Sequence, residues 1–159
     1  PSPEEAPRRE GRRLRILGVD YGDRNVGLAL SDSLGFTAQP LMTYRMTDRE
    51  VEDRAFFETL IRKHEVGRIV LGFPLRMDGS AGTRVDKTRA FAAWLASFAG
   101  APVDYWDERL TTHQALGLIH EQKVRQKSKK AVLNQISAAL ILQGYLDSRR
   151  GHADGPEDR

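Results

Sequence analysis

The chain has 159 residues, the length of a single domain with a sizeable core, and its formal charge is only +3. It has no cysteine, which excludes disulfides, thiolate nucleophiles and cysteine zinc sites and suits a cytoplasmic protein. No apolar run reaches about 18 residues, and no secretory signal precedes the first apolar stretch, so we expect neither a membrane span nor secretion.

The two ends of the chain differ in composition from its middle. Residues 1–13 are rich in Pro, Glu and Arg, and residues 148–159 are similarly polar. Such segments cannot bury enough apolar surface to fold, so we expect two disordered tails. They leave residues 14–147 as one folded domain.

The folded part opens with three expected strands, at residues 14–19, 26–30 and 36–44. Gly22, Asp23 and Asn25 form a short turn between the first two, and another short turn leads to the third. Turns this short join neighbouring antiparallel strands, so the sequence predicts a meander.

A helical period follows the third strand. Thr47 or Asp48 is the expected N-cap of this helix. The residues at helical spacing are Val51, Ala55, Phe56, Leu60 and Ile61.

Strands and helices alternate in the second half of the chain. Residues 68–73 form a continuous apolar strand, expected to be buried on both faces. A helix over 85–98, stopped by Gly100, separates it from a strand over 102–106. Further helices are expected at 111–122 and 131–146.

This order predicts an α/β fold with a mixed five-stranded sheet. The first three strands are antiparallel, and the last two join the sheet in parallel through right-handed crossovers, with helices on both faces. In such sheets, functional sites gather at the carboxyl ends of the parallel strands.

Acidic residues follow two of these strands. Asp20 ends the first strand, and Asp107 and Glu108 follow the fifth. If Asp20 and Glu108 meet at one edge, a divalent cation relieves their repulsion, and oxygen ligands favour Mg²⁺ or Mn²⁺. The structural alternatives are a turn residue at Asp20 and a Glu108 that pairs with Arg109 or caps the next helix.

The glycines near Asp20 leave a second functional reading open. Asp20, Gly22 and Gly27 also fit the phosphate-binding turn of two-domain ATPases and sugar kinases. A chain with room for one domain argues against that reading.

Basic residues indicate a nucleic-acid partner. The run KVRQKSKK over residues 123–130 holds five cations and no acid, and such a run attracts polyanions. A glycine-rich loop over residues 72–82 adds a further cation, Arg76, and an acid, Asp78. The candidate contacts to phosphate are Arg76, Arg109, Lys127, Lys129 and Lys130.

Taken together, these motifs resemble the YqgF/RuvX family of ribonuclease-H-like proteins. The resemblance covers roughly residues 14–146 and rests on GVDYGDRNVGLALSD, IVLGFPLRMDGSAG, DERLTT and SAALILQGYL. It implies a ribonuclease-H-like fold and two-metal-ion phosphodiester hydrolysis. Asp20 then matches the first catalytic acid of the family and Glu108 the second.

The third acid of the family is replaced in this chain. Aligning SAALIL places Asn134 at the position of that acid, so we count Asn134 with the catalytic set. A carboxamide offers an oxygen ligand but no negative charge. Asp78 or Asp107 is a possible substitute acid.

We therefore expect a metal-dependent nuclease that acts on structured RNA or branched DNA. The resemblance implies 5′-end maturation of pre-16S rRNA, and Holliday junction resolution is the other family role. The alternative is a nucleic-acid-binding module of the same fold that does not cleave, because Asn134 cannot supply the negative charge of the third acid. Either a monomer or a homodimer fits the sequence.

Overall fold

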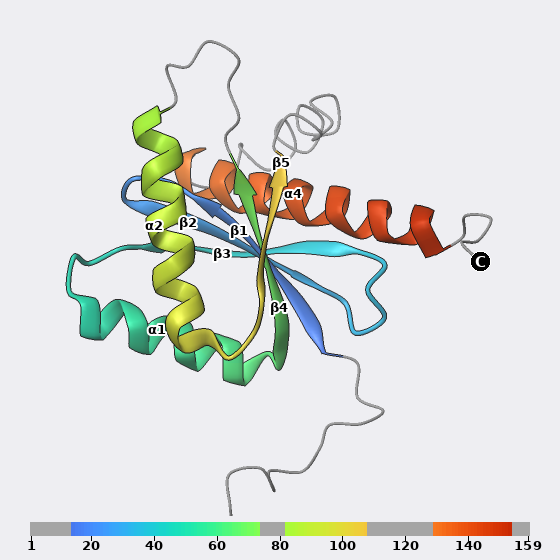
Figure 1. Ribbon diagram of the computed structural model, residues 1–159, viewed down its shortest axis with the longest axis horizontal. Helices are drawn as coiled ribbons and strands as arrows, with labels where there is room; N and C mark the ends of the chain where they lie inside the picture. Colours follow the sequence, from blue (N-terminus) through green and yellow to red (C-terminus); the bar gives the residue numbers. More distant parts are fainter. Residues whose placement is uncertain (1–13, 74–81, 108–128, 154–159) are drawn as a thin grey trace, which may run out of the picture.

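The computed structural model describes residues 14–73, 82–107 and 129–153. Figure 1 shows a twisted sheet with α4 along one face and α1 and α2 along the other. The strands are β1 (Arg15–Tyr21), β2 (Asn25–Ser31), β3 (Ala38–Arg45), β4 (Val66–Phe73) and β5 (Val103–Asp107). The helices are α1 (Glu50–Lys63), α2 (Gly82–Ala99) and α4 (Lys129–Ala153).

The strands lie in the order β3-β2-β1-β4-β5. Strands β1, β2 and β3 pair antiparallel, whereas β4 pairs parallel with both β1 and β5. The mixed five-stranded sheet predicted from the sequence is confirmed. Because β1 and β5 both run parallel to β4, their carboxyl ends lie at one edge, which we call the carboxyl edge.

Two buried cores cover the two faces of the sheet. Alternation along β1 sends Leu17 and Val19 to the core under α1 and α2, and Ile16 to the core under α4. Phe57 of α1 and Leu95 of α2 are fully buried in the first core. Ala138 and Leu142 of α4 are fully buried in the second.

Helix α1 corrects two details of the sequence prediction. Val51 is 77% exposed and Ala55 is also exposed, because the helix turns Phe57 and Leu60 toward the sheet. The predicted N-caps, Thr47 and Asp48, are wrong as well: Arg49 is the N-cap, without a side-chain cap bond.

The side chain of Asp53 explains the different start of α1. Its carboxylate accepts hydrogen bonds from the Thr47 backbone N–H at 3.0 Å, the Thr47 hydroxyl at 2.8 Å and the Tyr44 hydroxyl at 2.7 Å. Thr47 therefore binds back to the first turn of the helix, and Asp48 takes a φ of 66°.

The other two helices extend their predicted ranges. Helix α2 ends at Ala99, before Gly100 with a φ of 66°, as the sequence predicts. Helix α4 continues to Ala153, beyond residue 147, where the expected domain ends. None of the helices in the described part of the chain is long and apolar enough to cross a membrane.

Candidate functional site

Asp20 lies at the carboxyl edge, on the face that α4 covers. It pairs with Gly27 of β2, and Gly27 pairs with Thr43 of β3. Alternation puts Asp20 on the same side of β1 as Ile16, whose side chain packs in the α4 core. The row Asp20, Gly27 and Thr43 therefore crosses three strands beneath α4.

The first turns of α4 rest directly on this row. The Thr43 hydroxyl donates a hydrogen bond to the backbone carbonyl of Ala131. At Gly27 the backbone of α4 comes so close that a Cβ would collide with the carbonyl of Asn134. Only glycine leaves room for the helix at that point.

Asn134 is thereby placed at the carboxyl edge with Asp20. Asn134 lines a hollow of about 390 Å³ together with the turn between β1 and β2. The lining residues are Gly22, Asp23, Arg24, Asn25 and Asn134. The residue expected at the position of the third acid thus lies beside the turn that follows Asp20.

Asp107 ends β5 at the same edge but alternates onto the other face. Trp106 packs in the α4 core, whereas Val103 packs in the core under α1 and α2. Asp107 is four residues after Val103, so its place in the alternation is with α2, opposite to Asp20. This placement argues against Asp107 as the substitute acid.

Several predicted site residues lie outside the described residues. They are Arg76, Asp78, Glu108, Arg109 and Lys127. Lys129 and Lys130 are the first residues of α4. Within the described ranges, no group of three His, Asp or Glu residues is close enough to hold a metal ion.

The structure adds cations that the sequence analysis missed. Arg24 lies in the turn after β1, Arg45 ends β3, and Arg84 and Lys87 lie in the first turns of α2. Lys87 pairs with Asp23 at 3.6 Å, which joins α2 to the turn after β1. These cations are scattered along the sequence, so only the fold reveals that they share the carboxyl edge.

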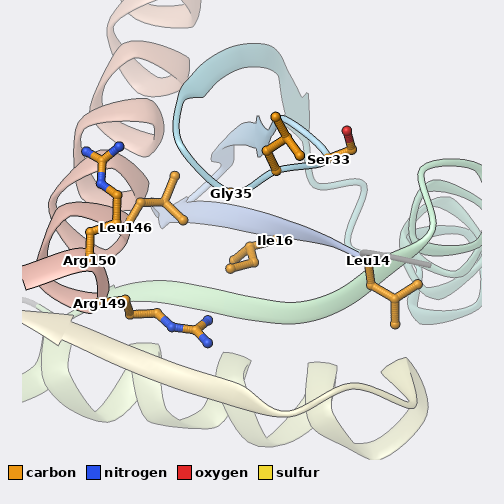
Figure 2. A pocket seen from close by; sticks show the side chains of 8 residues that line it. Leu14, Ile16, Ser33, Gly35, Leu146, Arg149 and Arg150 are labelled. Carbon is orange, nitrogen blue, oxygen red and sulfur yellow. The ribbon is translucent and has the colours of Figure 1, made fainter. Parts of the chain in front are cut away.

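A second hollow, of about 330 Å³, lies at the opposite end of the sheet (Figure 2). Leu14 and Ile16 from the start of the sheet line it, with Leu146, Arg149 and Arg150 from α4. Arg149 lies over the ring of Tyr145, and Arg150 contacts Asp147 and lies over Phe36. No residue that the sequence analysis selected lines this hollow.

Among the described residues, Tyr44 and Asp53 have shifted pKa values, and Tyr44 packs on the face of the sheet opposite to α4. Burial raises the pKa of Tyr44 to about 12, with a further contribution from its bond to Asp53. Burial also acts to raise the pKa of Asp53, but hydrogen bonds from Thr47 and Tyr44 outweigh it and leave that pKa below its ordinary value. This pair joins β3 to α1 and serves the fold.

Comparison with known families shows which family the chain belongs to. The model of the family RuvX, described as Holliday junction resolvase, matches residues 14–148. The chain belongs to the RuvX family. The resemblance inferred from its motifs is confirmed.

Curated relatives match this RuvX protein over nearly their whole length. A relative from Halothermothrix orenii, named "Putative pre-16S rRNA nuclease", is 45% identical, with 84% of this chain and 95% of the relative covered. Relatives of the same name from Myxococcus xanthus and Halalkalibacterium halodurans are 43% and 41% identical. They are covered over 90% and 99% of their length, with 86% of this chain in each case.

Among solved structures, this RuvX protein is similar to Thermus thermophilus RuvC. The complex of RuvC with a Holliday junction substrate has a TM-score of 0.56 at 17% identity, with 87% of this chain and 96% of that chain covered. A further RuvC structure gives 0.57 at 12% identity, with 87% and 97% covered. The shared fold confirms the predicted ribonuclease-H-like class.

Proposed function

We propose that this RuvX protein is a metal-dependent nuclease that hydrolyses phosphodiester bonds in structured RNA, with 5′-end maturation of pre-16S rRNA as its role. The observation that carries the proposal is that α4 rests at Asn134 on Gly27, the ladder partner of Asp20, at the carboxyl edge. The names of its relatives support the choice of substrate.

The donor groups of the carboxyl edge suit a hard divalent cation. Asp20 offers carboxylate oxygens, and Asn134 offers a carboxamide oxygen. Glu108, which directly follows β5, would add a second carboxylate. Oxygen ligands of this kind favour Mg²⁺ or Mn²⁺.

Different residues of the chain would have different roles in phosphodiester hydrolysis. A bound Mg²⁺ or Mn²⁺ supplies Lewis acidity, which favours ionisation of the attacking water and offsets charge on the leaving oxygen. Asp20 and Glu108 would hold that cation, and Asn134 would orient the water or add an oxygen ligand. Arg24, Arg45 and Lys87 would neutralise neighbouring phosphates.

The direct test is cleavage of an end-labelled pre-16S rRNA fragment by the purified protein with Mg²⁺ or Mn²⁺. Asp20→Asn should abolish cutting, because it removes the carboxylate charge without changing the size of the side chain. Glu58→Gln is the matched control, because Glu58 lies on the exposed face of α1 and pairs only with Arg54 at 3.5 Å among the described residues. Activity that survives Asp20→Asn would sink the assignment.

A second candidate function rests on Asn134 alone. A site with a carboxamide at this position has one negative charge fewer than a site with the third acid of the family. Such a site suits a module that binds nucleic acid without cleaving it. Asn134→Asp separates the two functions. In a nuclease, the added carboxylate should raise cutting by about 10-fold or more, the range that metal-site contacts contribute. No cutting by the wild type or by Asn134→Asp with either metal would favour the binding module.

A further inference from the structure

The turn that lines the hollow beside Asn134 has a backbone held by hydrogen bonds. The turn between β1 and β2 is closed by a hydrogen bond of 3.0 Å from the Gly22 N–H to the Asn25 carbonyl. The Met46 N–H donates to the Arg24 carbonyl at 2.7 Å, which ties the turn to the end of β3. These bonds fix the backbone of the turn, and so the positions from which the side chains of Arg24 and Asn25 extend, before any ligand arrives.

The side chains around the hollow carry complementary recognition groups. Arg24 is exposed and presents a guanidinium, which suits a phosphate. Asn25 and Asn134 present carboxamides, each with a donor and an acceptor side by side. Within the described residues, neither carboxamide has a side-chain hydrogen bond.

An amide group of this kind matches the polar edge of a nucleobase, which also places donors and acceptors side by side. With a volume of about 390 Å³, the hollow falls in the size range of small-ligand sites. A guanidinium and carboxamides in one hollow of this size suit a nucleotide, whose phosphate would bind the arginine and whose base edge would bind a carboxamide.

The position of the hollow relates it to the chemistry. Gly22 follows Asp20 by two residues, and Asn134 lies over Gly27, the ladder partner of Asp20. A nucleotide in the hollow would therefore neighbour a phosphodiester held at Asp20.

We propose that this hollow binds one unpaired nucleotide next to the scissile phosphate, with Arg24 on its phosphate and Asn25 on its base edge. The proposal rests on the nuclease function proposed above and makes these two residues determinants of specificity. It requires an unpaired base, because pairing occupies the base edges and the major groove of an RNA helix is too narrow for side chains.

Binding in EDTA tests the hollow separately from cleavage. Fluorescence anisotropy would measure the affinity of a labelled RNA hairpin with an unpaired 5′ extension and of the same hairpin with blunt ends. The wild type should prefer the extension. Asn25→Ala should weaken binding of the extended hairpin by about 10-fold and leave the blunt hairpin unchanged. Arg24→Ala should weaken binding of the extended hairpin and reduce the slope of log K against log salt by about 1.

Arg62→Ala is the matched control, because Arg62 is an exposed arginine in the last turn of α1, away from the carboxyl edge. Its substitution should not change the preference for the extension. Thermal melts confirm that each variant is folded, and Asn25→Gln should recover part of the affinity.

Three results would overturn the proposal, and they point to different failures. If Asn25→Ala and Arg24→Ala prefer the extended hairpin as the wild type does, the hollow is not the subsite, while the nuclease function stands. If the wild type does not prefer the extension, the requirement for an unpaired base is wrong. If the wild type binds neither hairpin and cuts no RNA, both proposals fail.

Discussion

Gly27 determines how closely α4 approaches the sheet at the proposed site. The backbone carbonyl of Asn134 occupies the space that a Cβ at position 27 would need. Thr43, on the next strand, holds the same turn of α4 through Ala131. The separation between Asp20 and Asn134 therefore depends on a residue that has no functional group of its own.

Gly27→Ala should displace the start of α4. Overpacking of this kind costs about 1–3 kcal/mol of folding free energy, and the displaced Asn134 should reduce cleavage much more than binding of RNA. Urea unfolding and cleavage assays on the same preparation check both effects.

Gly67→Ala is the matched control for this prediction. Gly67 is also a strand glycine, and a Cβ there would come within 2.5 Å of the Leu14 side chain, so that any shift is confined to Leu14 at the other end of the sheet. Cleavage by Gly67→Ala should stay near the wild-type rate. If Gly27→Ala cleaves as well as Gly67→Ala, the position of α4 does not control the site.

At the scale of elements, α1 is joined to the sheet by a buried carboxylate. Asp53 is 3% exposed and accepts three hydrogen bonds from Tyr44 and Thr47. A buried acceptor with this many donors fixes the end of β3 against the first turn of α1. The predicted N-caps failed because Thr47 donates to Asp53 and accepts a hydrogen bond from the N–H of Arg49, so that Arg49 takes the N-cap position.

Asp53→Asn should destabilise the protein by about 1–3 kcal/mol at pH 7, because an amide cannot accept all of these bonds. The pKa of Asp53 in the fold lies below its ordinary value of 3.8. Its contribution to stability is therefore complete above pH 3.8 and is lost as the pH falls through the lower folded pKa.

Urea unfolding of wild type and Asp53→Asn at pH 7 and near pH 3 checks this sign. The difference in unfolding free energy should shrink at the lower pH. Asp86→Asn, at an exposed position of α2, should change stability by less than about 0.5 kcal/mol at either pH. A difference for Asp53→Asn that is independent of pH would contradict the role of its charge.

At the scale of the whole molecule, the sequence predicted the sheet because its strands and helices alternate clearly. The parallel pairing of β1, β4 and β5 follows from that alternation, and it places Asp20 at the carboxyl edge. Asn134 was found from the family pattern, since its residue type carries no signal of a site.

Contacts between distant parts of the chain were beyond sequence reasoning. Nothing local shows that Gly27 lies under α4, that Arg24 and Asn134 line one hollow, or that Asp53 of α1 binds Tyr44 of β3. Helical spacing also identified Val51 as an apolar position of α1, yet Val51 is exposed because Phe57 and Leu60 in the core set the orientation of the helix. Each miss involves packing between elements.

The central claim is that Asp20 holds a divalent cation at the carboxyl edge, and Mn²⁺ binding followed by electron paramagnetic resonance tests it most directly. We expect the wild type to bind Mn²⁺, with an affinity that falls about 10-fold or more in Asp20→Asn and rises in Asn134→Asp. Glu58→Gln should bind as the wild type does. Equal Mn²⁺ affinity in the wild type and Asp20→Asn would contradict the account.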